Sequence, residues 1–424
     1  MPEDMPDGEH RTPLDGRRLL VVSTNYAPEL TGIGPYAAQL AEHWARSGAD
    51  THVLTGMPHY PSWRTEAAYR GVWRTEEQRA GVTVHRRRHY VPPRQSALRR
   101  AAFEATVLAH GLAAPPALRP DAVIAQLPSL AGGVIGARLA RRHGIPYIPV
   151  VQDLMGAAAA QSGIRGGGRA AALASRAERY ALGAATLVGV IHESFVPRVT
   201  AYGVDPERIR LVPNWTHVQA PSADRATTRA RLGWREGTPV VLHSGNMGLK
   251  QGLEVLVDAA RLAPEIRVVL MGDGNQRDAL LARASGLPNL DFLPPAGADE
   301  FTDVLAAADV LAVTQRASVL DMSVPSKLTS YFVSGRPVIA SVADGGGTAQ
   351  EVQRSGAGLL VAPEDPAAVL AAVRKLVEEP SAADGLGSNG PRYVARHLGR
   401  EAGLARFDAL ITEVLQDAEG KDRR

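Results

Sequence analysis

The residues with the clearest chemical potential lie at positions 243–252, where the chain reads His-Ser-Gly-Asn-Met-Gly-Leu-Lys-Gln-Gly. Glycines such as Gly248 let the backbone approach a bound group closely. Asn246 offers an amide and Lys250 a cation, and both groups can hold the oxygens of a phosphate. A helical pattern follows, so unpaired N–H groups at its start would add to the attraction for an anion. The segment predicts a phosphate-binding loop, with a plain glycine-rich turn as the alternative.

A later loop adds charge to the same half of the chain. Arg316 and Asp321 lead into residues 325–328, Pro-Ser-Lys-Leu, which open another helical pattern. Ser326 and Lys327 therefore stand at the expected start of a helix. A strand-end loop that brings an arginine and a lysine to a helix start is suited to a diphosphate.

Two further loops of the second half carry glycine and acid. Residues 345–347 are three glycines after an apolar run, with Gly347 at the expected helix start and Glu351 beyond it. Asp273 lies in a Met-Gly-Asp-Gly segment at 271–274, which an ordinary turn explains unless it adjoins a ligand. Each loop is unremarkable alone, but several at strand ends indicate one shared ligand site.

The first half begins with a similar arrangement. Gly32 and Gly34 follow an apolar run and stand just before a helical pattern that starts at Pro35, a residue suited to a first helical turn. The dinucleotide fingerprint needs a third glycine, which is missing here. The pair therefore predicts either a close approach to an anion or an ordinary turn.

Positive charge is concentrated at residues 85–89, His-Arg-Arg-Arg-His, and continues at Arg94, Arg99 and Arg100, although the net charge is only +3. Such a run could meet nucleic acid, anionic lipid or a pyrophosphate, or it could form a solvated basic face. Nucleic acid is disfavoured because the run lacks interleaved aromatic residues.

The elements that must position these residues follow a repeated alternation of short apolar runs and helical patterns. In the first half, the runs typical of buried parallel strands lie at 18–23, 52–54, 122–125, 147–151, 186–190 and 209–212. After a polar connector, runs recur at 239–243, 267–271, 310–313, 337–340 and 358–361. Pro149 argues for an irregular edge strand. The alternation predicts an α/β protein of two Rossmann-like domains facing across a cleft, with ligands at the carboxyl ends of the strands.

A length of 424 residues suits two domains. We expect a disordered leader at 1–16, a first domain at 17–215, a second at 216–390 and a C-terminal helix at 391–424 that packs back on the first domain. Cysteine is absent from the sequence, which excludes disulfides and thiolate metal sites. A polar, acidic start and the lack of a long apolar run predict a cytoplasmic protein whose membrane contact, if any, is peripheral.

Several motifs together resemble family 4 of the glycosyltransferases, which have the two-domain B-type (GT-B) architecture, over residues 18 to about 415. The shared segments are residues 26–35 (Tyr-Ala-Pro-Glu-Leu-Thr-Gly-Ile-Gly-Pro), 58–63, 151–154, 212–215, 244–248 and 325–328. The branch it resembles comprises fucosyl or N-acetylfucosaminyl transferases of colanic-acid and O-antigen synthesis. The resemblance implies retaining transfer of a hexose or deoxyhexose from a nucleotide sugar, held by the second domain, to a saccharide acceptor held by the first.

The resemblance also implies roles for individual residues. Lys250 would stabilise the leaving diphosphate, and Asp153 would contact the acceptor hydroxyl or orient the sugar. Residues expected at the donor are Gly32, Gly34, Asn246, Gly248, Lys250, Asp273, Arg316, Ser326, Lys327, Ser330, Gly347 and Glu351. Two positions depart from the family, because Asn246 replaces an arginine and Ser330 replaces a glutamate. A third departure is Gln152, which stands where the family commonly has a histidine.

On the acceptor side, the resemblance places His59, Tyr60 and Trp63 near the sugar, where aromatic rings can stack; burial in the core is the alternative for each. Members of this branch act on polyprenyl-diphosphate-linked sugars at the inner membrane face. The basic stretch 86–100 and the apolar stretch 101–112 could accordingly rest on anionic lipid.

The implied mechanism needs no cofactor, since the leaving diphosphate can itself accept the proton as the acceptor attacks the same face. The sequence has no Asp-x-Asp motif, so we expect no metal requirement. Two other functions remain open at this stage. One is a non-hydrolysing nucleotide-sugar epimerase of the same fold, and the other is a non-catalytic sugar- or lipid-binding subunit.

Overall fold

The computed structural model describes residues 12–29, 32–93, 96–127, 129–154, 167–216, 218–297, 299–319 and 327–422. The chain divides into two compact units. The first unit consists of residues 1–214 and 403–424, and the second consists of residues 215–402. No helix in the described ranges is long and apolar enough to cross a membrane.

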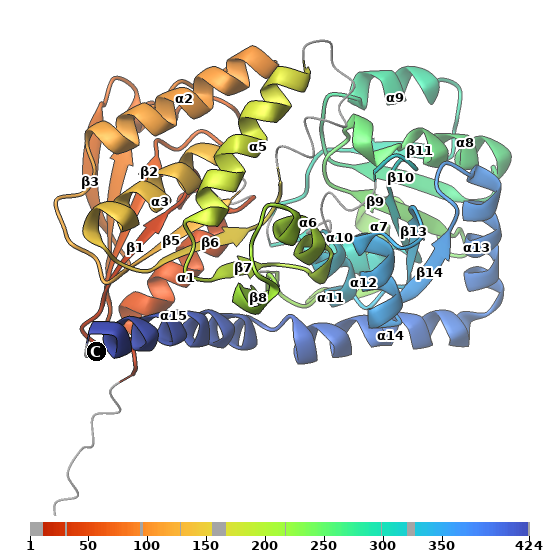
Figure 1. Ribbon diagram of the computed structural model, residues 1–424. Helices are drawn as coiled ribbons and strands as arrows, with labels where there is room; N and C mark the ends of the chain where they lie inside the picture. The colour runs from red at the N-terminus through yellow and green to blue at the C-terminus, as the bar shows by residue number, and fades with distance from the viewer. Residues whose placement is uncertain are drawn as a thin grey trace, which may run out of the picture. The chain divides into compact units, whose positions relative to one another are not determined.

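The first unit is built on an eight-stranded sheet (Figure 1). Its strands are β1 (Arg18–Val22), β2 (Asp50–Gly56), β3 (Arg74–Arg79), β4 (Val82–Arg87), β5 (Ala122–Leu127), β6 (Tyr147–Val151), β7 (Val188–Val190) and β8 (Ile209–Leu211). They lie in the order β3-β4-β2-β1-β5-β6-β7-β8, and only the β3–β4 pair is antiparallel. The strand order reverses between β1 and β5, which is where ligands bind in sheets of this kind.

Helices cover both faces of this sheet. They are α1 (Gly34–Arg46), α2 (Ala97–Ala113), α3 (Leu130–His143), α5 (Gly167–Gly183), α6 (Val196–Ala201) and α15 (Arg400–Asp422). Figure 1 shows α2, α3 and α5 over one face and α1 and α15 on the other. Local sequence sets the bounds of α3. The Ser129 side chain caps its first turn by accepting the Gly132 N–H, and Gly144 ends it with a φ of 67°.

The second unit contains a six-stranded parallel sheet. Its strands are β9 (Val240–Ser244), β10 (Arg267–Met271), β11 (Leu290–Leu293), β12 (Val310–Thr314), β13 (Val338–Ser341) and β14 (Gly358–Val361). Their order is β11-β10-β9-β12-β13-β14, so the reversal falls between β9 and β12. The helices are α7 (Arg225–Arg231), α8 (Glu254–Leu262), α9 (Arg277–Arg283), α10 (Phe301–Ala307), α11 (Lys327–Val333), α12 (Gly347–Ser355), α13 (Pro366–Glu378) and α14 (Pro380–His397).

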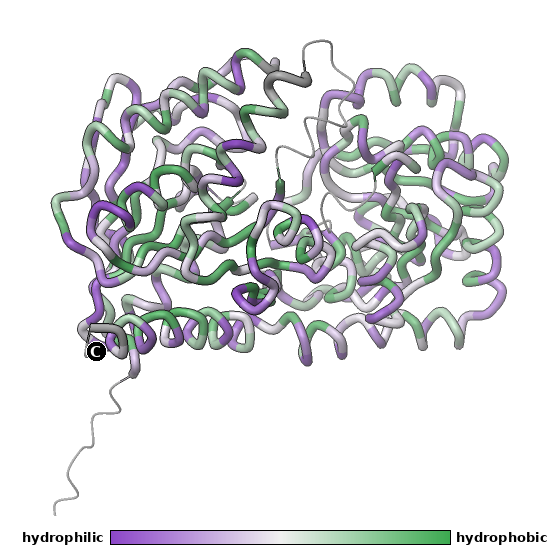
Figure 2. Tube along the Cα trace, in the orientation of Figure 1, coloured by the Kyte–Doolittle hydropathy of each residue, from purple (hydrophilic) through white to green (hydrophobic). Residues whose placement is uncertain are grey.

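Apolar strands form the centre of both units, as the predicted runs require. In Figure 2 hydrophobic residues concentrate along the strands, whereas the helices alternate between hydrophobic and hydrophilic positions. Two separate clusters of buried side chains, one around Leu242 and one around Leu270, cover the two faces of the second sheet. The expectation of an edge position for residues 147–151 is wrong, since β6 lies between β5 and β7. Its pairing with β7 begins at Val150, one residue after Pro149.

The C-terminal segment forms two helices rather than one. The expected boundary at residue 390 falls inside α14, which belongs to the second unit, and only α15 joins the first. Asp408 of α15 accepts hydrogen bonds from His43 Nε2 at 2.8 Å and Trp44 Nε1 at 2.9 Å, both on α1. Ile411 and Val414 of α15 are fully buried.

Candidate active site

Two glycine loops interlock at the carboxyl ends of β9 and β10. The Gly245 N–H donates to the Met271 carbonyl at 2.9 Å, and the Met247 N–H donates to the Asp273 carbonyl at 2.8 Å. Gly272 has a φ of 140°, and a Cβ there would lie 2.0 Å from the Gly245 carbonyl oxygen. Glycine is therefore required at this crossing, because any side chain would separate the loops.

Arg316 holds the next part of this loop, residues 249–252, in place. Its Nε donates to the Leu249 carbonyl at 2.8 Å, and its backbone N–H donates to the Lys250 carbonyl at 3.0 Å. The guanidinium also forms ion pairs with Glu254 at 2.7 Å and Glu364 at 3.1 Å. Arg316, which the sequence predicted as a donor-binding residue, therefore positions this loop in the structure. The loop lies where the strand order reverses, between β9 and β12.

Asn246 and Lys250 lie on the exposed side of the loop that Arg316 positions. A Cβ at Gly248 would lie 2.8 Å from the Asn246 amide nitrogen and 2.7 Å from Gln251 Oε1. The amide therefore packs closely over the glycine. This arrangement leaves the Lys250 ammonium and the Asn246 amide available to a ligand on the same short loop.

A buried histidine and a half-buried lysine lie beside the same loop. Lys327, the first residue of α11, donates from Nζ to His243 Nε2 at 3.1 Å, while His243 Nδ1 donates to the Ala312 carbonyl at 3.1 Å. A Cβ at Gly245 would lie 3.4 Å from Lys327 Nζ. Loss of hydration lowers the pKa of Lys327 to about 7, and burial, aided by the lysine charge, lowers the pKa of His243. The neutral histidine thus serves as an acceptor that orients the lysine.

Among the acidic and hydroxyl candidates of the second unit, Glu351 and Ser330 are buried and Asp273 is exposed. Glu351, on α12, accepts a hydrogen bond from the Tyr393 hydroxyl at 2.8 Å. Ser330 is buried on α11. Gly347 opens α12, and its N-cap residue Gly346 makes no side-chain cap. The Asp273 carboxylate accepts the N–H of its neighbour Gly274 at 2.8 Å. Ser326 and Asp321 lie outside the described residues.

In the first unit, the loops after β1 and β2 meet. Gly32 has a φ of 68°, and a Cβ there would lie 3.2 Å from Cε1 of the Tyr60 ring. Tyr60 is 36% exposed, whereas His59 is buried. Trp63 adopts a positive φ of 51° and packs its ring edge-on to both of these rings. The structure therefore brings three predicted residues together with Gly32, while Gly34 lies in the first turn of α1.

Gln152 and Asn214 form a reciprocal amide pair. The Asn214 amide donates to Gln152 Oε1 at 2.7 Å, and the Gln152 amide donates to Asn214 Oδ1 at 3.1 Å and to Gln126 Oε1 at 3.4 Å. Next to it, Asp153 Oδ1 accepts the Leu154 N–H at 2.8 Å. Both polar atoms of the Gln152 side chain are hydrogen-bonded, and an amide does not act as a base. Gln152 therefore has a structural role beside Asp153.

Comparison with known proteins places the chain in a family. Residues 31–215 match the glycosyl transferase 4-like domain, and residues 238–379 match the glycosyl transferases group 1 domain. The chain is 32% identical over 341 residues to WcaI of Escherichia coli K12, which is named as a colanic acid biosynthesis glycosyl transferase; the match covers 77% of this chain and 84% of that one. The chain belongs to family 4 of the glycosyltransferases.

Two other comparisons agree with this assignment. A GDP-mannose-dependent alpha-mannosyltransferase of Mycobacterium tuberculosis is 29% identical, with 82% of this chain and 84% of the relative covered. The solved sucrose-phosphate synthase of Thermosynechococcus elongatus superposes with a TM-score of 0.75 at 20% identity, covering 95% of this chain and all of that one. The glycosyltransferase has the GT-B fold that its sequence predicted, and its membership of a glycosyltransferase family decides against the epimerase.

The basic stretch of this glycosyltransferase is exposed only in part, at residues such as Arg88 and Arg99, and Arg94 lies outside the described residues. Residues 82–87 form strand β4, and Arg86 is fully buried. Its guanidinium donates to Glu77 at 3.0 Å, to the Ala27 carbonyl at 2.5 Å and to the Gly56 carbonyl at 3.4 Å. His85 and His89 are also buried. Side chains alternate between the two faces of a strand, so part of the basic run points into the protein, where the buried groups contact other residues of the fold.

The sequence does not reveal the roles of two of these residues. His243 is only the first residue of the glycine loop there, although a histidine near the end of a buried strand is a recognisable signal. Asn214 lies in the shared segment 212–215, which assigns it no role. Their roles depend on contacts between residues far apart in the chain, which spacing does not reveal. Within the described ranges, no group of three or more histidine, aspartate or glutamate side chains could hold a metal ion.

Proposed function

We propose that this glycosyltransferase moves a hexose or deoxyhexose from a nucleotide sugar to a saccharide acceptor, with retention of configuration, in cell-surface polysaccharide biosynthesis. The names of its relatives, one for colanic acid biosynthesis and one for a GDP-mannose-dependent transfer, support both the process and the class of donor.

The observation that carries the proposal is the pair of lysines at the reversal between β9 and β12. Lys327 is held beside Gly245 by His243, and Lys250 lies on the loop that Arg316 fixes. Pre-positioned cations of this kind stabilise the charge that develops on a leaving diphosphate. The first turn of α12, which also follows a strand, has no side-chain cap. Its N–H groups are therefore further candidate donors to the diphosphate.

In this mechanism the protein positions the reactants and stabilises charge. The diphosphate leaves and takes the proton of the attacking hydroxyl on the same face of the sugar. Lys250 and Lys327 stabilise the diphosphate, and Asp153 orients the acceptor. The lysines meet the need for positive charge, so we further propose that no metal is required. Unchanged transfer rates after chelation with EDTA would support this, and a loss of rate restored by Mg²⁺ would refute it.

Replacement of Lys250 tests the donor site directly. We expect Lys250→Ala to lower kcat about a hundredfold, the loss typical when one preorganised donor to a developing anion is removed. Lys375→Ala is the matched control, since this lysine is exposed on α13. Equal turnover in both variants would remove Lys250 from the role.

Melting temperatures with UDP-, GDP- and dTDP-sugars would identify the base of the donor, because a ligand of the folded state raises the melting temperature.

We also propose that the acceptor is lipid-linked and that α2 rests on anionic lipid. The outer face of α2 exposes Leu98 (82% exposed), Ala101, Ala105 and Ala109, spaced three or four residues apart, and the exposed Arg99 follows Leu98 directly. Trp73, 64% exposed, lies beside His110 near the other end of this helix. Apolar and basic groups on one helix face suit an interfacial position.

Sedimentation with phosphatidylglycerol vesicles tests this surface. We expect binding at low salt that weakens at high salt, and loss of binding in Leu98→Glu. Leu173→Glu provides the control, because Leu173 is 68% exposed on a different helix, α5. Equal binding by both variants, or no binding by the unmodified protein at either salt concentration, would reject the surface.

A further inference from the structure

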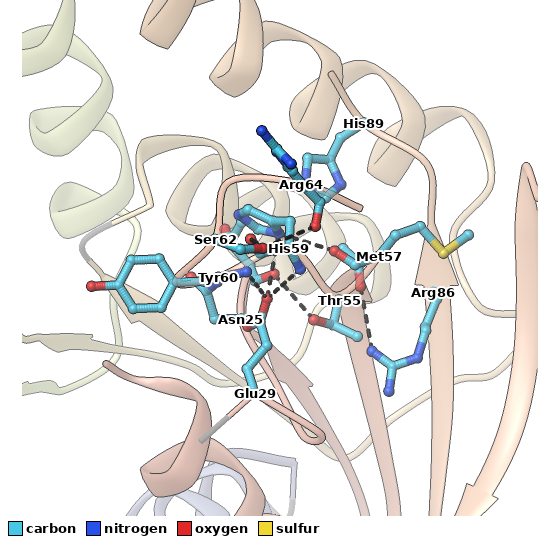
Figure 3. Close-up of polar contacts among 12 residues, drawn as sticks. Asn25, Glu29, Thr55, Met57, His59, Tyr60, Ser62, Arg64, Arg86 and His89 are labelled. Carbon is cyan, nitrogen blue, oxygen red and sulfur yellow. Dashed lines mark hydrogen bonds and ion pairs between the residues drawn. The ribbon is translucent and has the colours of Figure 1, made fainter. Parts of the chain in front are cut away.

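A buried carboxylate joins the two loops that carry the predicted acceptor residues. Glu29, in the loop after β1, is 4% exposed. Its Oε1 accepts the backbone N–H groups of His59 at 2.7 Å and Tyr60 at 2.8 Å, both in the loop after β2. Figure 3 shows the carboxylate directed at this backbone. Hydrogen bonds to an ionised acceptor are about twice as strong as neutral ones, so Glu29 fixes these two residues firmly.

Loop attachment alone does not explain Glu29, since Arg86 already joins the bases of the same two loops. Its guanidinium contacts the carbonyls of Ala27 and Gly56, and its charge is balanced by Glu77. Glu29 acts further out, at the tip of the second loop. Among the described residues, the ion-pair partner of its carboxylate is the His59 ring, with Nδ1 at 3.4 Å.

The position of Glu29 carries a cost. Its Oε2 is buried and has no hydrogen-bond partner among the described residues. Burial also lowers the pKa of His59, which favours a neutral ring and therefore leaves the carboxylate without a full countercharge. A buried carboxylate with an unpaired oxygen opposes stability. The two charge-assisted N–H bonds offset part of this cost, and their structural effect is on the residues that they hold in place.

What they hold is the Tyr60 ring. The ring lies against the turn at Gly32, whose positive φ and missing side chain leave room for it. Trp63 supports it edge-on at a centroid distance of 6.2 Å and itself adopts a positive φ, a strain typical of functional sites. Figure 3 shows the ring projecting away from the polar cluster. A partly exposed, rigidly held aromatic ring is suited to stacking on a sugar.

We propose that Glu29 is a positioning residue for the acceptor, which acts by fixing the backbone of Tyr60 so that its ring forms a platform for the acceptor sugar. The inference rests on the proposed function, because it requires a saccharide acceptor. It adds a residue to that site and separates the platform, Tyr60, from the group that sets its orientation.

Transfer kinetics with a double-mutant cycle test the proposal. We expect Tyr60→Ala to raise the acceptor KM about tenfold and Glu29→Ala to raise it by a similar factor, with donor KM unchanged in both. Because Glu29 acts through Tyr60, Glu29→Ala should add no further increase in the Tyr60→Ala background. Glu29→Gln should recover most of the acceptor affinity, since its amide oxygen can still accept both N–H groups.

Hydrogen exchange provides a readout that is independent of activity. Peptides covering residues 57–66 should exchange faster in Glu29→Ala than in the unmodified protein or in Glu29→Gln, while nucleoside diphosphate should still raise the melting temperature of all three. Multiplicative KM effects in the cycle, or a loss of donor binding together with acceptor binding, would overturn this inference alone. An unmodified enzyme that transfers no sugar would overturn the proposed function and this inference with it.

Discussion

At the scale of single residues, Lys327 couples ligand binding to protonation. Its lowered pKa of about 7 means that the free protein holds the ammonium only in part near neutral pH. An anionic diphosphate favours the charged form, so its binding at pH 8 must take up a proton. The affinity should therefore fall as pH rises from about 6.5 to 8.5, a window set by this pKa.

Calorimetric titration of nucleoside diphosphate in buffers of different ionisation heat would measure this proton uptake. Lys327→Arg is the matched variant, because arginine keeps its charge throughout this range. We expect its affinity to be nearly independent of pH. The same pH dependence in Lys327→Arg as in the unmodified protein would show that another group takes up the proton.

Gly272 is a residue whose replacement should be costly to the second unit. An alanine there would adopt an unfavourable φ and place its Cβ 2.0 Å from the Gly245 carbonyl oxygen. We expect Gly272→Ala to lower the free energy of unfolding by about 3 kcal/mol or more in urea titrations. Gly286→Ala isolates the backbone effect, since Gly286 has a φ of 80° and open space around it. Its cost should be about 1 kcal/mol; similar losses would mean that the loops can separate freely.

At the scale of elements, burial decides how much each basic residue in and after β4 contributes to stability. Arg86→Ala should remove the groups that join the loops after β1 and β2 and leave Glu77 unpaired. Because the Glu77 side chain is 26% exposed and can be rehydrated, we expect a loss of about 3 kcal/mol, at the lower end for a broken buried pair. Arg88→Ala serves as the comparison. That guanidinium lies over the exposed Trp73 ring at 5.1 Å, and its loss should cost about 1 kcal/mol or less. Denaturant titration would measure the free energy of unfolding of both variants. A larger loss for Arg88→Ala than for Arg86→Ala would contradict this assignment.

The same elements show which parts of the fold the sequence could predict. Uniformly apolar runs such as β5 and β9 were predicted because a strand buried on both faces needs little else. Strands β3 and β4 were missed because β3 is mostly charged and β4 ends in the His-Arg-Arg part of the basic run, so neither forms an apolar run. The glycine loops were predicted from spacing, since close backbone approach requires glycine. Glu29 and His243, by contrast, act through tertiary contacts, and nothing in the neighbouring letters specifies their partners.

At the scale of the whole molecule, buried histidines make the protein sensitive to acid. Burial lowers the pKa of His59, His85 and His243, and it lowers that of His89 to about 3. Each folded-state pKa lies below the unfolded value near 6.5, so the unfolded chain binds more protons below that pH. Stability is full above about pH 6.5 and falls as pH decreases. For His89, whose pKa is lowered to about 3, the loss is about 1.4 kcal/mol for each pH unit below 6.5.

Scanning calorimetry between pH 7.5 and pH 5 would measure this loss as falling melting temperatures. His89→Gln should show a shallower decline in the transition of the first unit, because it removes one titrating group from that unit. The transition of the second unit, which contains His243, should respond to pH as before. A melting temperature that rises on acidification would contradict the assignment of these rings as neutral.

The contacts of α15 have a consequence for biosynthesis. Asp408 completes the surroundings of His43 and Trp44, so the first unit includes residues that are synthesised only after the whole of the second unit. During translation this unit must wait, incompletely covered, while the ribosome makes the whole of the other one. Nascent chains should therefore resist protease in the second unit before the first.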